Sequence, residues 1–506
     1  MLFDTQTRYN TRCMYSRDPK VRKRKAQLRY LSYVLIAVIA LVVGVVSLFY
    51  VRGFRLDSTK FEVRAGGLLK FGTVPQDATI YLDGKQIENT PYQSNVASGT
   101  HTIKYTKNQY KSWEKTIKVA PEQVLWANYA QLVPEKIETK SLRTFASLSL
   151  ASASPTREWM LLQASPQARE FTLVNATDER NIRFSDIKIP AESLKLSPGE
   201  NESFAVIDWI DNARLMLLQH TVGGQKEFIL MPRDDPAKTI NLNAFSNRAI
   251  TSVQAAPTTN NYFFVHTNEG TLHRINSNDK NDVETIAERV RSFSALNENV
   301  VAYASDSEQT TPEEKINRSL LIWQRGQQMH IFMRYLPLDS PTYINFTRYA
   351  SRDYLSVASR TGIDITENPL SATKKIVLNK LLPFSPQFMT VSPNNRFINL
   401  QSGAQMYTYD VELDTVSEFN LETVVPRPAQ WIDDFRLADY EAGNVRMIEF
   451  DGHNAQQITQ STTGFDVLHG GDSESLITIK KNETDGRFEL QQSSLRLPGD
   501  LPFLRV

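Results

Sequence analysis

The chain has 506 residues, which is too long for one ordinary domain. Its 57 lysines and arginines nearly balance its 56 aspartates and glutamates, so no overall field recruits nucleic acid. The single cysteine, Cys13, leaves the rest of the chain without disulfides or thiolate metal sites. Any domain after it must therefore be large enough to be held together by burial alone.

Residues 1–30 are polar and basic, and we expect a mostly disordered cytoplasmic tail that becomes helical toward its end. The cluster Arg22, Lys23, Arg24 and Lys25 lies directly before an apolar run. A basic tail can also bind lipid or nucleic acid. Because this one adjoins the apolar run, we interpret it as a topology signal.

The run from Leu31 to Tyr50 contains no charged residue over 20 positions. As a helix it would cover about 30 Å, the thickness of a bilayer's hydrocarbon core. The sequence therefore predicts a transmembrane helix over 31–51, with the lipid bilayer as its partner. The basic cluster before it predicts a single-pass plasma-membrane protein whose bulk is extracytoplasmic. A cleaved signal peptide is the alternative, but the apolar run is longer than such a peptide requires.

After a short charged stalk at 52–66, the pattern changes to period two over 67–120. Strands are expected at 68–74, 79–82, 99–105 and 112–119, with no helix. Asp83-Gly84 predicts a tight hairpin turn, because both turn positions need a positive φ. These features predict a small antiparallel β-sandwich.

The same stretch carries a resemblance to the PEGA domain. It rests on Val74 to Lys85, the pair Thr90-Pro91, Gly99-x-His101-x-Ile103 and the later Tyr110. Asn89 and Gln109 depart from the family pattern, which normally has glycine there. The positions that match the motif are Pro75, Ala78, Asp83, Gly84, Thr90, Pro91, Gly99 and His101. The resemblance implies a β-sandwich module of envelope proteins that serves in interaction or spacing and brings no catalytic residues.

Residues 121–143 are interpreted as a linker that could supply a strand, near 137–141, to close the following domain. From 144 to 506 the sequence shows only short apolar runs separated by turns, which is typical of a sandwich, barrel or propeller. Together these segments make the predicted fold mainly β.

One repeat favours the propeller. The segment from Trp209 through Asp211 to Leu215 recurs from Trp431 through Asp433 to Leu437, about 222 residues later, or five steps of about 44 residues. Ser-Pro turns such as Ser392-Pro393 resemble the blades of TolB-like and dipeptidyl-peptidase-type propellers. We expect eight blades, with seven as the alternative. Each Trp is expected to begin a strand and pack between blades, and each Asp to fix a turn.

No catalytic set is found in the sequence. Gly471 to Ser475 lacks the last glycine of a nucleophile elbow, and the histidines have no zinc-binding spacing. The histidines at 220, 266 and 273 are interpreted as packing or edge residues. Asn276 to Asp282 lacks the glycine and glutamate of a calcium loop, so a polar turn is favoured. We therefore expect no enzyme activity, no cofactor and no metal.

The leading hypothesis is a membrane-anchored scaffold that displays a propeller for binding an envelope protein or polysaccharide, with no nucleic-acid partner. An extracytoplasmic lyase or glycan hydrolase is the second hypothesis, and a surface sensor is the third. A cluster of ionisable residues at the propeller channel would favour the enzyme. The polar insert at 306–317 is a further candidate contact with a partner.

Overall fold

The computed structural model describes residues 19–51, 55–57, 62–64, 66–309, 311, 315–338, 341–360 and 362–500. The chain divides into two compact units. The smaller unit includes residues 80–103 and 116–128, and the larger one is built mainly from the chain after residue 128. Parts of the predicted insert, residues 310 and 312–314, lie outside the described residues.

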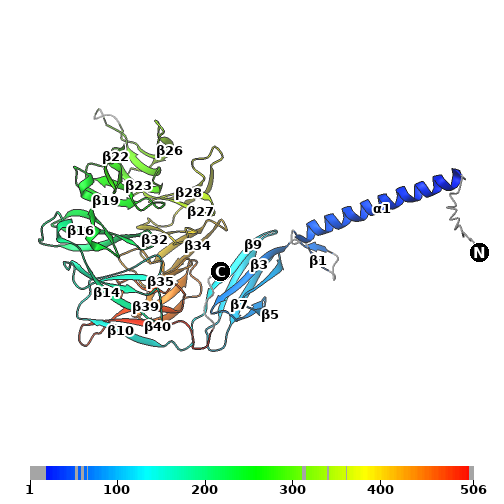
Figure 1. The fold of residues 1–506 in the computed structure, drawn as a ribbon, viewed down its shortest axis with the longest axis horizontal. Coiled ribbons are helices and arrows are strands. Elements are labelled where there is room, and N and C mark those ends of the chain that lie inside the picture. The colour runs from blue at the N-terminus through cyan, green and yellow to red at the C-terminus, as the bar shows by residue number, and fades with distance from the viewer. Residues whose placement is uncertain are drawn as a thin grey trace, which may run out of the picture. The chain divides into compact units, whose positions relative to one another are not determined.

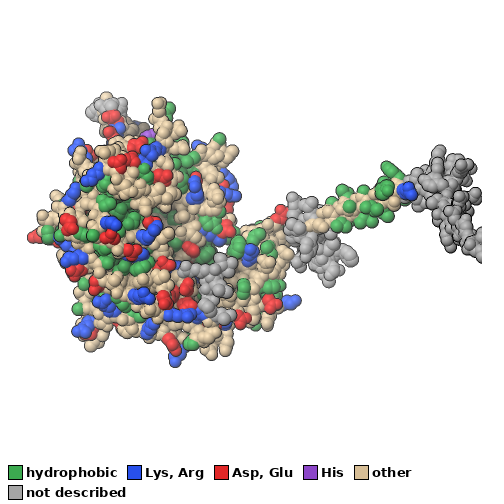
Figure 2. Space-filling model, viewed as in Figure 1, with side chains coloured by type: hydrophobic (Ala, Val, Ile, Leu, Met, Phe, Trp, Pro, Cys, Tyr) green, Lys and Arg blue, Asp and Glu red, His purple; other side chains and the backbone are tan. Residues whose placement is uncertain are grey.

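Helix α1 (Pro19–Val51) contains the whole apolar run. Its described side chains are exposed and largely hydrophobic, as Figure 2 shows, and Leu31 is 69% exposed. Within the part of the chain that the structure describes, no helix has the length and apolar character needed to cross a membrane. The predicted helix is thus confirmed, whereas its membrane crossing is not. The side chains of Tyr50 and of Arg22, Lys23, Arg24 and Lys25 lie outside the described residues.

Short strands β1 (Arg55–Asp57) and β2 (Glu62–Arg64) pair in the expected stalk. Two sheets follow, in the orders β6-β3-β9 and β5-β4-β7-β8. Their strands are β3 (Gly66–Val74), β4 (Thr79–Leu82), β5 (Lys85–Asn89), β6 (Tyr92–Ala97), β7 (Gly99–Thr106), β8 (Trp113–Val119) and β9 (Val124–Gln131). Alternate side chains such as Leu69, Ile80 and Ile103 are fully buried, as period-two patterning requires. The predicted strands are confirmed, but β9 lies in the segment interpreted as a linker.

Residues 150–460 of the larger unit form seven successive antiparallel sheets within the described chain (Figure 1). The first three contain β11 (Leu150–Ala153), β12 (Trp159–Gln163), β13 (Glu170–Asn175) and β14 (Arg183–Lys188); β15 (Ser203–Ile210), β16 (Leu215–Val222), β17 (Gln225–Pro232) and β18 (Ile240–Asn241); and β19 (Ile250–Ala255), β20 (Tyr262–Thr267), β21 (Leu272–Asn276) and β22 (Asp279–Ala287). The next two contain β23 (Val290–Asn297), β24 (Val300–Asp306), β25 (Arg318–Gln324) and β26 (Ile331–Leu336); and β27 (Tyr343–Tyr349), β28 (Arg352–Ser359), β29 (Gly362–Glu367) and β30 (Lys375–Leu381). The last two contain β31 (Phe388–Val391), β32 (Phe397–Ser402), β33 (Gln405–Asp410) and β34 (Thr415–Asn420); and β35 (Arg436–Glu441), β36 (Asn444–Glu449) and β37 (Gln456–Gln460).

An eighth sheet combines the two ends of this unit. Its order is β10 (Thr139–Phe145), β40 (Phe488–Ser494), β39 (Ser475–Lys481) and β38 (Leu468–His469). Strands β10 and β40 lie side by side in Figure 1, with Thr139 opposite Ser493 and Phe145 opposite Phe488. The expectation that the segment before residue 144 supplies an outer strand is therefore confirmed, with bounds shifted toward the C-terminus.

Apolar clusters join neighbouring sheets. Leu217 of β16 packs in one cluster with Phe263 of β20, and Ile322 of β25 shares another with Leu355 of β28. Because each sheet buries both faces in this way, its strands read as short, nearly continuous apolar runs. The chain is therefore mainly β, with propeller-like sheets. The count of eight blades, with seven as the alternative, stays a prediction.

Candidate functional site

The hairpin at Asp83-Gly84 has the predicted turn conformation. Asp83 has φ 52° and Gly84 has φ 78°, so both lie in the left-handed region. Asp83 Oδ1 accepts a hydrogen bond from the Thr102 backbone at 2.9 Å, and its Oδ2 lies 2.7 Å from His101 Nδ1. The hydrogen bond to His101 lowers the pKa of Asp83. This aspartate therefore ties the hairpin to the neighbouring strand, a structural role.

The other motif positions of the small sheets lie at turns and packed sites. Pro75 and Pro91 each follow a cis peptide bond, Ala78 is fully buried, Thr90 is 4% exposed, and Gly99 has φ 144°. His101 Nε2 bonds the Ala97 carbonyl at 2.8 Å. This arrangement gives the motif a role in shaping the fold.

The two repeat tryptophans hold equivalent positions. Trp209 Nε1 donates to Ser152 Oγ of β11 at 3.1 Å, and Trp431 Nε1 donates to Thr390 Oγ1 of β31 at 3.2 Å. Each indole therefore reaches the first strand of the preceding sheet. The position within the strand was predicted wrongly, because Trp209 lies near the end of β15, and Trp431 makes only an isolated bridge to Leu437. The hairpin turn that follows each Trp is what made the pattern resemble a strand start.

The two repeat aspartates differ. Asp211 has φ 53° and accepts from Arg214 Nη2 at 2.7 Å in an exposed turn. Asp433 is 5% exposed and accepts from Arg436 Nη1 at 2.7 Å and from the Phe435 backbone at 2.8 Å. Its Oδ2 also lies 3.0 Å from His469 Nδ1. The same sequence pattern thus makes a surface turn in one sheet and a buried charge cluster in another.

A cavity of about 230 Å³ lies beside this cluster, lined by residues of β11, β31 and β38 and by residues 430–432, which precede β35. Its polar wall includes Ser154, Arg157, Gln430, Asp466 and His469, and its apolar wall includes Pro155, Val391, Pro393 and Trp431. At roughly 30 Å³ per water molecule, the cavity has room for about eight waters or one ring-sized ligand. We take it as the candidate functional site.

Internal contacts hold the charged groups of this cavity in place. Arg157 Nη2 donates to the Gly471 carbonyl at 2.8 Å and Nη1 to Ser473 Oγ at 3.3 Å. Asp466 accepts from Arg427 Nη1 at 2.5 Å and from the Ala153 backbone at 3.0 Å. The wall is therefore preorganised, because its charged side chains already have fixed partners.

The histidine and aspartate of the cluster have opposite electrostatic environments. Burial lowers the pKa of His469 although Asp433 acts against it, so the imidazole is neutral near pH 7. Burial would raise the pKa of Asp433, but Arg436 and His469 hold it below its ordinary value. Because an ionised carboxylate only accepts, Nδ1 of His469 carries the proton. Nε2 then has a free lone pair and no hydrogen-bond partner among the described residues.

Sequence reasoning missed Arg157 and His469. His469 is the last paired residue of β38, the position that the apolar Ile210 holds in β15. A polar residue at this repeat position was the available signal. Its partners come from other sheets, so their convergence is visible only in the fold.

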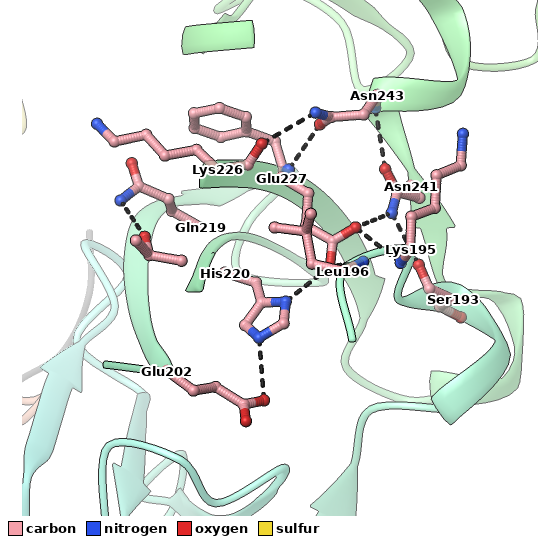
Figure 3. A network of polar contacts seen from close by, with 12 residues as sticks. Ser193, Lys195, Leu196, Glu202, Gln219, His220, Lys226, Glu227, Asn241 and Asn243 are labelled. Atoms are coloured by element: carbon pink, nitrogen blue, oxygen red, sulfur yellow. Dashed lines mark hydrogen bonds and ion pairs between the residues drawn. The ribbon is translucent and has the colours of Figure 1, made fainter. Parts of the chain in front are cut away.

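A second buried histidine lies in a closed network (Figure 3). His220 Nδ1 lies 2.6 Å from Glu227 and its Nε2 lies 3.0 Å from Glu202, while Asn241 donates to Glu227 at 2.6 Å. The imidazole also stacks on Phe204 with ring centroids 4.4 Å apart. These contacts support the interpretation of His220 as a packing residue.

The described residues hold no group of three or more His, Cys, Asp or Glu side chains suited to a metal ion. The segment from Asn276 to Asp282 contains the turn between β21 and β22 at residues 277 and 278 and the start of β22, where Asp279 accepts from the Asn281 backbone at 2.9 Å. Tyr262 and Asn276 both donate to Asp282 at 3.2 Å. The favoured polar turn is confirmed.

Comparison with known proteins gives one family match. Residues 67–134 match the PEGA domain. No curated protein matches the chain.

Several solved structures are similar to the chain at low sequence identity, and one of them is a β-propeller domain. The Myceliophteria thermophila Cps50 (Swd1) β-propeller domain shows 10% identity and a TM-score of 0.35, covering 71% of this chain and 99% of its own. Porphyromonas gingivalis dipeptidyl peptidase 4 shows 12% identity and a TM-score of 0.40, covering 68% and 57%. Citrobacter koseri AztD shows 9% identity and a TM-score of 0.36, covering 71% and 91%. The chain thus carries a PEGA domain at residues 67–134.

Proposed function

We propose that the chain is a membrane-attached, extracytoplasmic binding protein that holds its propeller-like unit at the cell envelope and recognises a protein or polysaccharide without catalysis. The PEGA domain and the propeller-like sheets support a binding or scaffold role. The described hydrophobic side chains of α1, such as Leu35 and Leu41 at 60% and 69% exposure, support attachment to lipid.

In this proposal the eight sheets close into a ring. Support comes from the sheet that contains β10 and β40, which shares apolar clusters with two others. Leu490 of β40 packs in one cluster with Met160 of β12, and Leu476 of β39 packs in another with Val445 of β36. In a closed ring every sheet has a neighbour on both sides, so no terminal sheet exposes an apolar face to solvent.

The observation that carries the binding function is the cavity with preorganised walls. A rigid concave surface that combines Trp431, two prolines and the side chain of Arg157 suits recognition of a small group on a larger partner. The carboxylates of Asp433 and Asp466 are engaged with Arg436 and Arg427 and are not free to exchange protons with a substrate.

Binding is tested with the full chain in phospholipid nanodiscs. Envelope polysaccharide and envelope proteins from the host are applied, and affinity is compared for the parent and Arg157→Gln. Arg214→Gln is the matched control, because Arg214 lies in the turn between β15 and β16, and Arg157 lies in the corresponding turn between β11 and β12 of the preceding sheet. We expect Arg157→Gln alone to weaken binding at least tenfold. Equal affinities for the parent and both variants would contradict a role for the cavity.

Localisation is tested separately through Cys13. In the proposed topology this thiol resists a membrane-impermeant reagent on intact cells and reacts after lysis. The protein should also stay with the membrane fraction after an alkaline wash. Labelling of Cys13 on intact cells would overturn the proposed orientation.

An extracytoplasmic enzyme is the second candidate, and the pair Asp433–His469 favours it. A neutral histidine oriented by a carboxylate is the arrangement of a general base. Release of reducing ends from envelope glycan by the parent, lost in His469→Gln and retained in His453→Gln, would support this candidate. Absence of turnover in the parent would leave the binding function.

A further inference from the structure

The last strand of each repeated sheet lies at one edge of that sheet, and we call these the outermost strands. They differ in the side chains that they expose. Among the described residues of these strands, large exposed apolar side chains gather on β26 and β30, two strands of neighbouring sheets. Phe332 and Tyr335 are 49% and 68% exposed, and Ile376 and Leu381 are 64% and 80% exposed. The other outermost strands together contribute one such residue, Val283 of β22, at 39%. The repeat thus provides an internal comparison that marks one part of the molecule.

Local backbone geometry brings the aromatic residues together. The pairing of β25 with β26 shifts register, because Leu320 faces Arg334 while Leu321 faces Phe332. The rings of Phe332 and Tyr335 consequently lie 5.1 Å apart at 62°. A cavity of about 140 Å³, lined by residues of both strands including Tyr335 and Leu381, connects them. We name Phe332, Tyr335, Ile376 and Leu381 the β26–β30 surface.

The β26–β30 surface borders a strand edge. In the described chain β30 pairs only with β29, so one row of its backbone groups has no neighbouring strand. Edge strands are commonly protected by charge or by a cover, because they offer a template for another strand. Here the exposed apolar side chains lie beside such an edge.

The charges around β30 are mainly positive. Lys374 and Lys375 are exposed and make no described ion pair, while Lys380 pairs with Glu418 at 2.8 Å. Across the cavity Arg334 pairs with Asp364. A partner that covers the apolar residues therefore meets a cationic border and gains from carrying carboxylates.

We infer that the β26–β30 surface binds an extended, acidic segment of a partner protein, which adds as a strand along β30. Backbone hydrogen bonds to the β30 edge supply part of the affinity. Apolar side chains of the segment cover Tyr335 and Leu381, and its carboxylates pair with Lys374 and Lys375. This contact is separate from the cavity beside Arg157 and does not depend on what that cavity binds.

The test uses the full chain in nanodiscs of neutral lipid and a fluorescein-labelled octapeptide of alternating valine and glutamate. Fluorescence anisotropy reports binding, with empty nanodiscs as the blank. We expect saturable binding that Tyr335→Ser and Leu381→Ser each weaken at least tenfold. Val283→Ser, the same kind of change on the outermost strand β22, should leave the affinity within twofold of the parent. Melting curves show whether each variant is folded.

Two further peptides test the geometry and the charge. Replacing alternate valines with proline removes backbone donors and should abolish binding, because proline cannot join a ladder. Replacing glutamate with lysine should weaken binding at least tenfold. Equal binding of either peptide would overturn the inference, as would absence of binding by the parent peptide. Self-association of the chain that Tyr335→Ser abolishes would instead assign the surface to a second copy.

Discussion

The two aspartates of the Trp-Ile-Asp repeat permit one substitution to be compared in two environments. Asn replaces Asp433 in one variant and Asp211 in the other, so size and sequence context are matched. At Asp433 the change removes the charge that faces Arg436, whose side chain is only 8% exposed. At Asp211 the partner Arg214 is 61% exposed, and asparagine tolerates the φ of 53°.

The expected magnitudes follow from these exposures. Breaking a buried ion pair by removing one partner costs about 3–5 kcal/mol, whereas an exposed pair contributes about 0–1 kcal/mol. For a cooperative unit of about 350 residues, an unfolding entropy of about 2.1 cal/mol/K per residue converts these values to melting shifts. Asp433→Asn should therefore melt about 4–7 °C below the parent, and Asp211→Asn within about 1.5 °C.

Scanning calorimetry at pH 7 measures both shifts, and a pH series adds a second test. Because the pKa of Asp433 lies below its ordinary 3.8, its stabilisation is present above that pH and is lost as the pH falls through the lowered value. Asp433→Asn should remove this part of the acid sensitivity. If the two variants melt within 1 °C of each other, the buried cluster does not stabilise the fold as reasoned.

Three further predictions use the same melting assay. His220→Leu leaves Glu202 and Glu227 without their shared partner and should lower the melting temperature by about 4–7 °C, whereas His453→Leu, at a side chain 66% exposed, should change it by less than about 1 °C. Gly452→Ala places a Cβ 2.6 Å from the Phe419 side chain at a φ of 81° and should cost about 1–3 kcal/mol more than Gly486→Ala, where no atom lies within 4 Å; equal costs would contradict the packing argument. Burial disfavours ionisation of Glu227, but hydrogen bonds from His220 and from the Lys195 backbone outweigh this effect, so the pKa of Glu227 lies below its ordinary 4.5. The stability that this carboxylate contributes is therefore present above pH 4.5 and is lost as the pH falls through the lowered pKa. The acid-dependent fall in melting temperature should be smaller in Glu227→Gln than in the parent.

Local chemistry made parts of the fold predictable. Asp83-Gly84 encodes its turn through two positive φ values, and period-two burial marks the strands on either side. The spacing between Trp209 and Trp431 also predicted a repeated sheet, because their hairpins lie in the second and the seventh of the successive sheets, which are five steps apart. These signals are contained in a few consecutive residues or in a regular repeat.

The candidate site depends on contacts between residues that are far apart in the sequence, so a pattern of neighbouring residues does not predict them. Asp211 and Asp433 follow the same Trp-Ile pair, yet only Asp433 meets a histidine, because His469 arrives from the next sheet. Strand β9 was interpreted as a linker because its exposed Val124 and Trp126 obscure the alternation. Pairing with β3, far earlier in the chain, decides its structure.

The pairing of β10 with β40 has a consequence for how the protein is made. Thr139 leaves the ribosome about 350 residues before its partner Ser493. At about 5–20 residues per second, β10 waits roughly 20–70 s for the strand that pairs with it. Over that interval each intervening sheet can fold onto the one before it, while the sheet that combines β10 with β38, β39 and β40 is completed last. A chain that stops before Phe488 therefore contains the strands of the seven preceding sheets but lacks β40, the strand that pairs with β10.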